Sequence, residues 1–599
     1  MILQSLYSLY DRLKEDRRYS VAPPGFSLQK ITFKVVLKLD GTLFQIQDVR
    51  VRTGSRMRPL QLLVPGDTKS SGSGLNPCFL WDNTVYMLGF KPDDDKPART
   101  KNAFNAFRQK HLNLENEIND PNFSAVCRFL KNWNPDDERA LSEKLEDVAT
   151  GFGVFQILGQ AQYVHEVTRI QEWWKDHAGS AEGFIAPCLL TGKPSIIARV
   201  HPKIRGVRNA QSTAAIVSFN ERSYESYGKE QSFNAPVSED AAFRYTTALN
   251  ALLDGPLKEK HRLWIGDATV AFWTDKPTFT EDIFAFFTSR GSSPIEGTDE
   301  VQDESLRERL EVFLKALRQG QQAYRELEDS PDRTSFYLLG LSPNAARISI
   351  RFFYCNSLTD LFENLRRHFS DISIHRQFGK ETNKPDPQFP AVWMFLRETA
   401  RDSKDIPPIL AGPLLRAIVT GCPYPGGLYS AVIRRIHADR NINYLRACVI
   451  KGYLTRNLKQ EVSMSLDTKR TEPAYRLGRL FAALEKTQTD ALGHQIGATI
   501  RDRFYSSASA TPRSVFPRLL RTYQHHLSKM ENYKINREKL VQEILDPLAD
   551  FPAQLNLADQ GLFAIGYYHQ MRAFFTKKDN LESSLANQAP AAKREKEGQ

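Results

Sequence analysis

The sequence is short of the features that mark a secreted, membrane-bound or zinc-binding protein. Its 599 residues include only six cysteines, at positions 78, 127, 188, 355, 422 and 448, without the CxxC or CxxxC spacing of a zinc site. It has no run of about 18 apolar residues, so we expect no membrane-spanning helix. Its first residues form an amphipathic helix pattern and not a secretion signal. We therefore expect a cytoplasmic protein with reduced thiols.

Recognised catalytic motifs are also missing. The sequence has no nucleophile elbow, no Rossmann glycine fingerprint and no Walker motif. A metal-dependent nuclease needs clustered carboxylates or His–Asp pairs, and the nearest candidates share no recognised spacing: Asp93–Asp95, His525–His526 and His569. We predict no catalytic residue, no metal site, no cofactor and no enzymatic activity.

What the sequence does have is length, apolar residues and positive charge. A chain of 599 residues that is 41% hydrophobic is too long for one core, so we expect two to four domains. The formal net charge of +11 favours a polyanionic partner.

The most informative stretch is basic and lies at residues 192–253. From Lys193 to Lys229 it holds seven Lys or Arg residues against two Glu residues, with amide and aromatic side chains between them. Cations suit phosphates, aromatic faces suit bases, and amides can recognise base edges. An ordinary solvated loop is the alternative interpretation.

Two segments within this stretch are predicted to hold its basic loop in a fixed position. The apolar run Ala214–Phe219 predicts a buried strand. Ser238 is suited to cap the N-terminus of a helix, and Tyr245, Ala248, Leu249 and Leu252 fall on one face of that helix. We expect a basic loop held between a fixed strand and a fixed helix.

A second candidate loop covers residues 64–76 and is rich in Gly and Ser. It follows Arg50, Arg52, Arg56 and Arg58, but it does not match a P-loop. A plain surface loop is the alternative. By residue type, the DNA-binding candidates in the two stretches are Lys69, Ser71, Ser73, Asn76, Lys203, Arg205, Arg208, Asn209, Gln211, Ser212, Asn220, Lys229, Gln231 and Asn234.

The pattern of the remaining chain predicts an α+β fold. Residues 31–51 predict a hairpin with a type I′ turn at Asp40-Gly41. Strand pairs are expected at 262–275 and 336–354, and helices from about residue 388. The expected parts are a mixed α+β region that recognises the DNA motif (1–387), a helical connecting region (388–460), a C-terminal helical bundle (461–576) and a disordered tail (577–599).

Long polar motifs in this chain resemble those of the large subunit of the type I-C CRISPR effector complex, or Cascade. The motifs that carry the resemblance include His201-Pro-x-Ile-x-Gly-Val, Val217-Ser-Phe-Asn220, Ser226-Tyr-Gly-Lys-Glu-Gln-Ser-Phe-Asn-Ala-Pro-Val-Ser238, Leu339-Gly-Leu-Ser-Pro-Asn344 and Gln560-Gly-Leu-Phe-Ala-Ile-Gly-Tyr-Tyr-His-Gln570. The similarity extends to about residue 576. One departure is Gln211-Ser-Thr-Ala214, where the family commonly has Gln-Ser-Ser-Gly, and the added Cβ disfavours a close backbone approach to a ligand there.

The resemblance implies a non-catalytic subunit of an RNA-guided surveillance complex. Such a subunit recognises the protospacer-adjacent motif (PAM) of duplex DNA, helps to open the duplex, stabilises the R-loop and recruits a helicase–nuclease in antiviral defence. Its partners would be target DNA, the CRISPR RNA through the complex, and the other Cascade subunits. A general RNA-binding scaffold and a metal-dependent nuclease are the alternatives.

The resemblance also implies that the C-terminal bundle exists as a separate small subunit. Met464 lies in the polar break at 461–471, where an internal translation start would release residues 464–599. Copies of this fragment would bind the displaced DNA strand through Arg501, Arg503, Arg513, Arg518 and Arg521. An ordinary linker methionine is the alternative.

Overall fold

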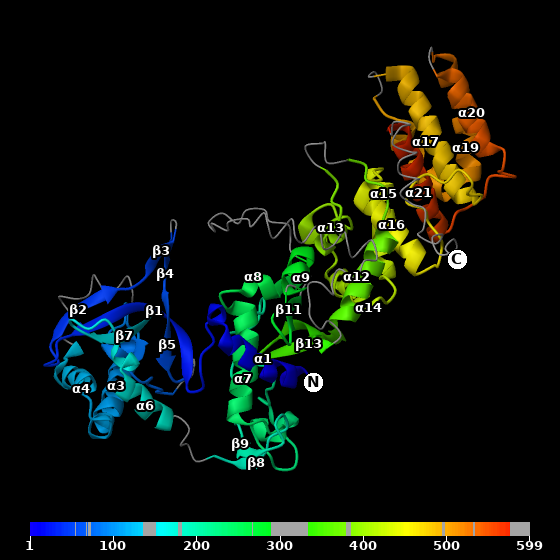
Figure 1. The fold of residues 1–599 in the computed structure, drawn as a ribbon. Helices are drawn as coiled ribbons and strands as arrows, with labels where there is room; N and C mark the ends of the chain where they lie inside the picture. The colour runs from blue at the N-terminus through cyan, green and yellow to red at the C-terminus, as the bar shows by residue number, and fades with distance from the viewer. Residues whose placement is uncertain are drawn as a thin grey trace, which may run out of the picture. The chain divides into compact units, whose positions relative to one another are not determined.

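The structure is a computed structural model of the whole chain. It describes residues 1–53, 56–67, 69, 74–135, 151–177, 183–265, 268–278, 280–288, 333–378, 385–493, 497–530 and 533–575. The chain divides into two compact units (Figure 1). Among described residues, the first unit holds 1–258 with the hairpin tip 343–349, and the second holds 259–342 and the chain from 350 onward. Acidic residues dominate segment 296–306, which is typical of a linker. This segment and the tail predicted at 577–599 lie outside the described residues.

The first unit is built on a five-stranded sheet. Its strands are β1 (Phe26–Leu37), β2 (Leu43–Asp48), β5 (Leu60–Pro65), β6 (Trp81–Asn83) and β7 (Phe152–Ile157), and a separate ribbon pairs β3 (Val51–Thr53) with β4 (Arg56–Arg58). The central strand β1 pairs antiparallel with β2 and parallel with β7. Three helices lie below the sheet in Figure 1, α3 (Pro97–Ile118), α4 (Pro121–Asn132) and α6 (Thr168–His177), and α2 (Thr84–Met87) follows β6. Period-2 alternation turns Phe33, Val35 and Leu37 toward these helices, which forms one core.

The predicted hairpin at 31–51 is confirmed, but its turn type is wrong. The amide of Lys38 donates to the carbonyl of Thr42, so the loop has three residues, 39–41. Within it Gly41 has a φ of +90°, while Asp40 has no positive φ. A type I′ turn needs positive φ at both central residues, so this loop is the longer kind that places one glycine in the left-handed region.

The helix predicted near the end of the basic stretch is α7 (Glu239–Asp254), and it packs against α1 (Ile2–Glu15). As predicted, the side chain of Ser238 caps α7, accepting a hydrogen bond from the amide of Ala241. Arg244 of α7 forms an ion pair with Asp11 of α1 at 2.9 Å. The predicted amphipathic N-terminal helix is thus confirmed and has a partner.

The strand predicted at Ala214–Phe219 is wrong. Ala214 and Ala215 are buried, but the segment forms only an isolated bridge between Ala215 and Arg347. The pairing with the start of the strand at Arg347–Ser357 does not extend beyond this one bridge, so the run is irregular chain and not a strand. A small ribbon of β8 (Ile185–Pro187) and β9 (Pro194–Ile196) precedes it.

The second unit begins with a four-stranded sheet in the order β10-β11-β12-β13. Its strands are β10 (Arg262–Ile265), β11 (Ala268–Thr274), β12 (Ser335–Asn344) and β13 (Arg347–Ser357), which confirms both predicted strand pairs. Its helices are α8 (Lys258–His261), α9 (Thr280–Thr288), α12 (Leu358–Ile372), α13 (Val392–Arg397), α14 (Ala411–Thr420), α15 (Gly426–Asp439) and α16 (Tyr444–Arg456).

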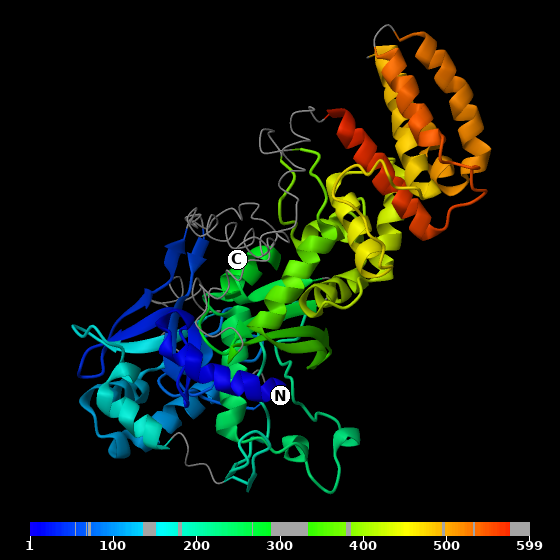
Figure 2. The same ribbon diagram turned by 45° about the vertical axis from the view of Figure 1, so that its right-hand side comes forward.

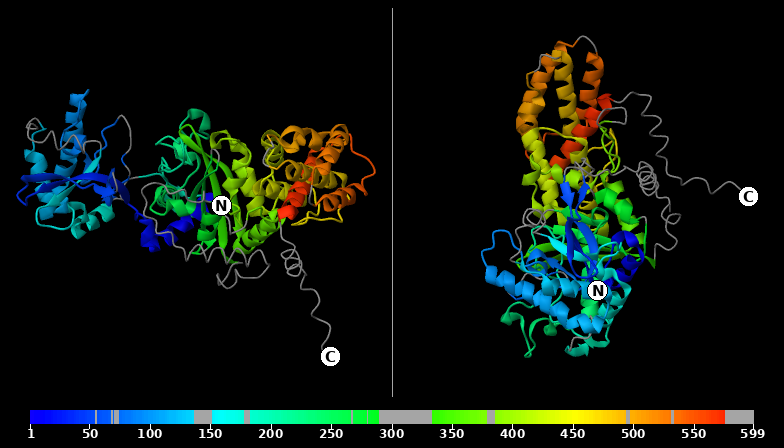
Figure 3. Two further views of the ribbon diagram at one scale, coloured as in Figure 1. Left: turned by 90° about the horizontal axis from the view of Figure 1, so that it is seen from above. Right: turned by 90° about the vertical axis from the view of Figure 1, so that its left-hand side faces the viewer.

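The last helices that the structure describes lie side by side, as Figures 2 and 3 show for the yellow-to-orange segment. They are α17 (Pro473–Leu492), α18 (Ile500–Ala510), α19 (Pro512–Ser528), α20 (Lys534–Leu545) and α21 (Leu557–Phe575). Helices α17 and α21 cross closely because glycines lie at the crossing. A Cβ on Gly478 would stand 2.0 Å from the carbonyl oxygen of Phe563, and one on Gly566 would stand 2.1 Å from that of Tyr475.

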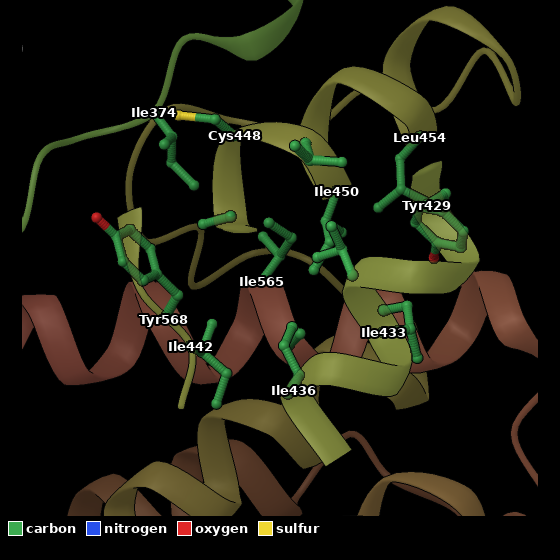
Figure 4. Packing of buried hydrophobic residues seen from close by; sticks show 14 of the residues in the cluster. Ile374, Tyr429, Ile433, Ile436, Ile442, Cys448, Ile450, Leu454, Ile565 and Tyr568 are labelled. Atoms are coloured by element: carbon green, nitrogen blue, oxygen red, sulfur yellow. The ribbon is translucent and has the colours of Figure 1, made fainter. Parts of the chain in front are cut away.

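One hydrophobic core continues across the polar break at residue 461. Figure 4 shows Ile565 and Tyr568 of α21 among side chains of α15 and α16, including Ile436 and Ile450. The hydroxyl of Tyr429 on α15 also donates to the carbonyl of Leu557, at 2.8 Å. The bundle 461–576 therefore shares its interior with the helices before it, and its separability stays a prediction.

The observed architecture confirms the predicted α+β class, with small, mainly antiparallel sheets followed by helices. Over the part of the chain that the structure describes, no helix is both long and apolar enough to cross a membrane.

Candidate nucleic-acid interface

The part of the basic stretch that precedes α7, residues 199–238, is here called the signature loop, and α7 fixes its start. The side chain of Asn250 on α7 accepts from the amide of Arg205 at 2.7 Å and donates to the carbonyl of Lys203 at 2.9 Å. A ring nitrogen of His201 lies 2.6 Å from the hydroxyl of Tyr245, also on α7. Both side chains are buried, and burial lowers the pKa of His201 to about 4, so it is neutral near pH 7.

The tip of the β12–β13 hairpin braces the middle of the signature loop. The amide of Ile348 donates to the carbonyl of Ala215 at 3.0 Å. The guanidinium of Arg347 lies 4.4 Å from the centre of the Tyr224 ring and donates to its hydroxyl at 2.9 Å. The sequence did not single out Arg347, because this contact joins residues 123 positions apart and has no local signal.

Two amide residues predicted to recognise DNA are engaged inside the loop. Asn234 accepts from the amide of Ser226 at 2.8 Å and donates to the carbonyls of Lys229 and Gln231 at 2.7 and 2.9 Å. The side chain of Gln231 accepts from Arg199 at 2.9 Å. These hydrogen bonds fix the shape of the loop. Direct base recognition by Gln231 or Asn234 stays a prediction, and it would compete with these hydrogen bonds.

Most of the other candidates in the loop are exposed. Lys203 is half-buried, and the exposed candidates are Arg205, Arg208, Asn209, Gln211, Ser212, Asn220 and Lys229. Cationic and amide side chains thus project from a backbone that is held by long-range hydrogen bonds. This arrangement can bind a phosphate backbone and present donors and acceptors to base edges.

In the Gly-rich loop at residues 64–76, the predicted DNA-binding lysine is engaged within the fold and not exposed like most candidates of the signature loop. The ammonium of Lys69 forms an ion pair with the fully buried carboxylate of Asp82 at 2.5 Å and donates to the carbonyl of Asn76 at 2.6 Å. Burial raises the pKa of Asp82, and the nearby Lys69 opposes that shift. Lys69 and Asn76 line a cavity of about 190 Å³ with Lys110 and Trp174. A DNA contact by Lys69 stays a prediction and would require breaking this ion pair, while Ser71 and Ser73 lie outside the described residues.

The five candidate arginines of the second unit fall into two groups. Arg501 is half-buried, with a guanidinium nitrogen 3.5 Å from Glu485, and Arg513 pairs with Asp550 at 2.6 Å. Arg503, Arg518 and Arg521 are exposed, and Arg518 lies over the ring of Phe504. Arg513 is exposed as well, but its guanidinium donates to Asp550 and to the carbonyl of Phe551. Arg503, Arg518 and Arg521 therefore suit a phosphate backbone better than Arg501 and Arg513.

The positions considered for a metal site are dispersed. Within the described ranges, no group of three or more His, Cys, Asp and Glu side chains is placed to hold a metal ion. His569 is buried beside the hydroxyl of Tyr475 at 2.9 Å, and burial lowers its pKa to about 3. Asp94 and Asp95 pair with Lys91 at the surface. That the chain is not an enzyme stays a prediction.

Together these features define a two-unit α+β protein that carries a braced, basic surface loop. A family model described as CRISPR-associated protein (Cas_Csd1) matches residues 6–575. The chain therefore belongs to the Csd1 family of CRISPR-associated proteins, which supports its assignment as a subunit of a Cascade complex acting in defence. A comparison with curated proteins found no match.

Proposed function

We propose that this protein is the large subunit of a type I-C effector complex. In this role it recognises the PAM on duplex DNA, helps to open the duplex, stabilises the R-loop and recruits a separate helicase–nuclease, while guide RNA pairing recognises the remaining target sequence. The chain itself catalyses no reaction.

The observation that carries the proposal is the set of exposed cationic and amide side chains on the signature loop. Arg205 and its neighbours project from a backbone anchored by Asn250 of α7 and by Arg347 of the hairpin tip. Recognition of a short motif needs a few side chains in fixed positions, and a braced loop supplies them without the ordering cost of a mobile one.

The exposed arginines of the second unit support a separate contact with the displaced strand. Arg518 and Arg521 lie three residues apart on α19, so they face the same side of that helix. Their spacing suits a strand that runs along the helix, because successive phosphates can each meet one guanidinium.

The test uses the assembled complex with its guide RNA and target duplexes with and without a PAM. Arg205→Ala should weaken binding to both duplexes alike and reduce the slope of log affinity against log salt by about one, as expected for one lost phosphate contact. Lys101→Ala, an exposed cation on α3, is the matched control and should change neither. A parent complex that binds both duplexes equally would contradict the proposal.

The same preparation separates the two alternatives. A nuclease would cut DNA or RNA in Mg²⁺ or Mn²⁺, and the activity would follow the purified chain through gel filtration and stop in chelator. A general RNA-binding scaffold would bind RNA without a guide complex and would ignore the PAM. We expect neither behaviour.

We further propose that Met464 starts a small-subunit polypeptide of residues 464–599. Mass spectrometry of the parent complex should detect this species, and Met464→Leu should remove it and lower DNA affinity. Because α21 packs on α15 and α16 in the full chain, the released fragment must cover that apolar face in another way. Absence of the short species from the parent complex would refute this proposal.

A further inference from the structure

A tight turn at Tyr227-Gly228 lies in an exposed part of the signature loop. Ser226 and Lys229 form an antiparallel bridge, and the amide of Lys229 donates to the carbonyl of Ser226 at 3.0 Å. Tyr227 has a φ of +55° and Gly228 a φ of +65°. This turn class favours Asn-Gly or Asp-Gly, because a larger side chain is strained in the left-handed region. A tyrosine here is therefore not explained by the needs of the turn.

Nor does packing explain the tyrosine. The residue is 99% exposed, whereas two other aromatic side chains of the loop, Tyr224 and Phe233, have partners. Tyr224 holds Arg347, and the ring of Phe233 packs edge-on against Phe184 at 5.2 Å. The Tyr227 ring thus contributes no burial to the fold, and its backbone conformation is unfavourable. Such a residue points to a contact outside the chain.

The backbone beneath the ring is held firmly. Asn234 bonds to both sides of the turn, since it accepts from the Ser226 amide and donates to the Lys229 carbonyl. Gln231 continues the bracing, because its amide donates to the carboxylate of Glu225 at 3.2 Å. The ring is therefore presented on a rigid support, as a stacking surface requires.

The charges near the turn favour a base over a phosphate as the partner. Residues 221–230 hold two cations, Arg222 and Lys229, and three glutamates, so this part of the loop offers no net attraction for a phosphate. Stacking on a base needs no net charge, because every base has a π-face. The excess of cations lies elsewhere in the loop, where Arg205 and Arg208 are exposed.

We propose that Tyr227 is a stacking platform for an unpaired DNA base and that Asn234 is the positioning residue that fixes the turn beneath it. This inference rests on the proposed function, since it identifies one contact that the signature loop makes with an opened strand.

The test measures binding of the full-length chain to two fluorescent strands of equal length by anisotropy. One strand is oligo(dT), and the other has the same phosphates but abasic sugars. The parent should prefer oligo(dT). Tyr227→Ala should weaken oligo(dT) binding about 5- to 150-fold, the range equivalent to about 1–3 kcal/mol for one stacked base, and should leave abasic binding unchanged. Tyr227→Trp should retain the preference.

Salt and stability measurements exclude indirect effects. Tyr227→Ala should not change the salt slope, whereas Arg205→Ala should reduce it and weaken both strands. Tyr227→Gly should leave Tm unchanged or raise it, because glycine relieves the left-handed strain, and yet it should lose the preference. Asn234→Ala should reduce the preference for oligo(dT) and keep abasic binding.

Two results would overturn the inference: a parent chain with no preference for oligo(dT) over the abasic strand, or a Tyr227→Ala variant that keeps the preference. If the parent prefers oligo(U) and Tyr227→Ala weakens binding to oligo(U) alone, the base that stacks on Tyr227 belongs to RNA and not to DNA. The proposed function fails separately, if the assembled complex does not discriminate PAM-bearing duplex, so the two failures are distinguishable.

Discussion

The signature loop and the C-terminal helices are both rich in arginine and lysine, but they use these residues differently. In the loop most candidate cations are exposed, and amides such as Asn234 hold the backbone. In the helices several arginines are inside the fold. Arg479 is fully buried and donates to Gln570 and Glu543, both at 3.1 Å, and Arg537 pairs with Asp490 at 2.8 Å. A basic composition therefore marks a nucleic-acid surface only where the cations are exposed.

The largest expected effect concerns the close crossing of α17 and α21. Gly478→Val should lower the free energy of unfolding of the second unit by at least about 3 kcal/mol, because the new side chain meets the backbone of α21. Urea unfolding measures this loss. Gly497→Ala is the control, since a Cβ there has no neighbour within 4 Å. Parent-like unfolding of the valine variant would show that the helices do not cross this closely.

The next prediction compares how the signature loop and the C-terminal helices lose stability at acid pH. His201 beside Tyr245 and His569 beside Tyr475 are buried, and burial lowers their pKa values to about 4 and about 3. The unfolded chain binds a proton near pH 6.5, but the folded chain does not. Each histidine therefore stabilises the fold above about pH 6.5, and this contribution falls by about 1.4 kcal/mol per pH unit as the pH drops below that value.

Urea unfolding at about pH 7, 6 and 5 tests this expectation. His201→Gln loses a hydrogen bond and should be less stable throughout, but its loss of stability on acidification should be shallower than the parent's by about 1.4 kcal/mol per unit. His569→Gln should likewise lower the stability of the second unit throughout and make its loss of stability on acidification shallower. If either variant keeps the parent's slope, that histidine is protonated in the folded state.

The sequence predicted those parts of the structure that depend on local patterns. Ser238 capping α7, the hairpin around Gly41 and the strand pairs of the second sheet follow from short-range spacing. The contact of Arg347 with Tyr224 and the hydrogen bond between Asn250 and the loop join positions far apart in the sequence, so no local pattern predicts them. The strand expected at 214–219 failed because strand formation needs a partner, and the apolar run alone does not specify one.

The candidate site was less predictable than the fold. Residue type placed Lys69 among the DNA-binding candidates, but only the fold shows its pairing with buried Asp82. Asn234 and exposed Asn220 are the same residue type in the same stretch, yet only Asn234 has its hydrogen bonds satisfied within the loop. Which polar groups remain exposed depends on long-range packing, and a single sequence does not contain that information.

A smaller effect should distinguish Arg518 and Arg521 from Arg513, whose guanidinium is engaged by Asp550 and Phe551. Arg518→Ala with Arg521→Ala should reduce the salt slope of target binding by about 1.4, the value for two phosphates of a single strand. Arg513→Ala is the matched control and should have a smaller effect, because that guanidinium donates both to Asp550 and to the carbonyl of Phe551. A salt titration of the assembled complex measures both. Equal effects for the two variants would show that pairing in the free chain does not limit DNA contact.

The most direct test of the central claim is the ratio of affinities for duplexes with and without the PAM. It compares the parent complex with a complex that carries Gln211→Ala, Ser212→Ala and Asn220→Ala, three exposed polar residues of the signature loop. One lost base contact is worth about 1–3 kcal/mol, so the ratio should fall about tenfold or more while the complex still assembles. An unchanged ratio in a fully assembled complex would contradict the claim that the signature loop recognises the motif.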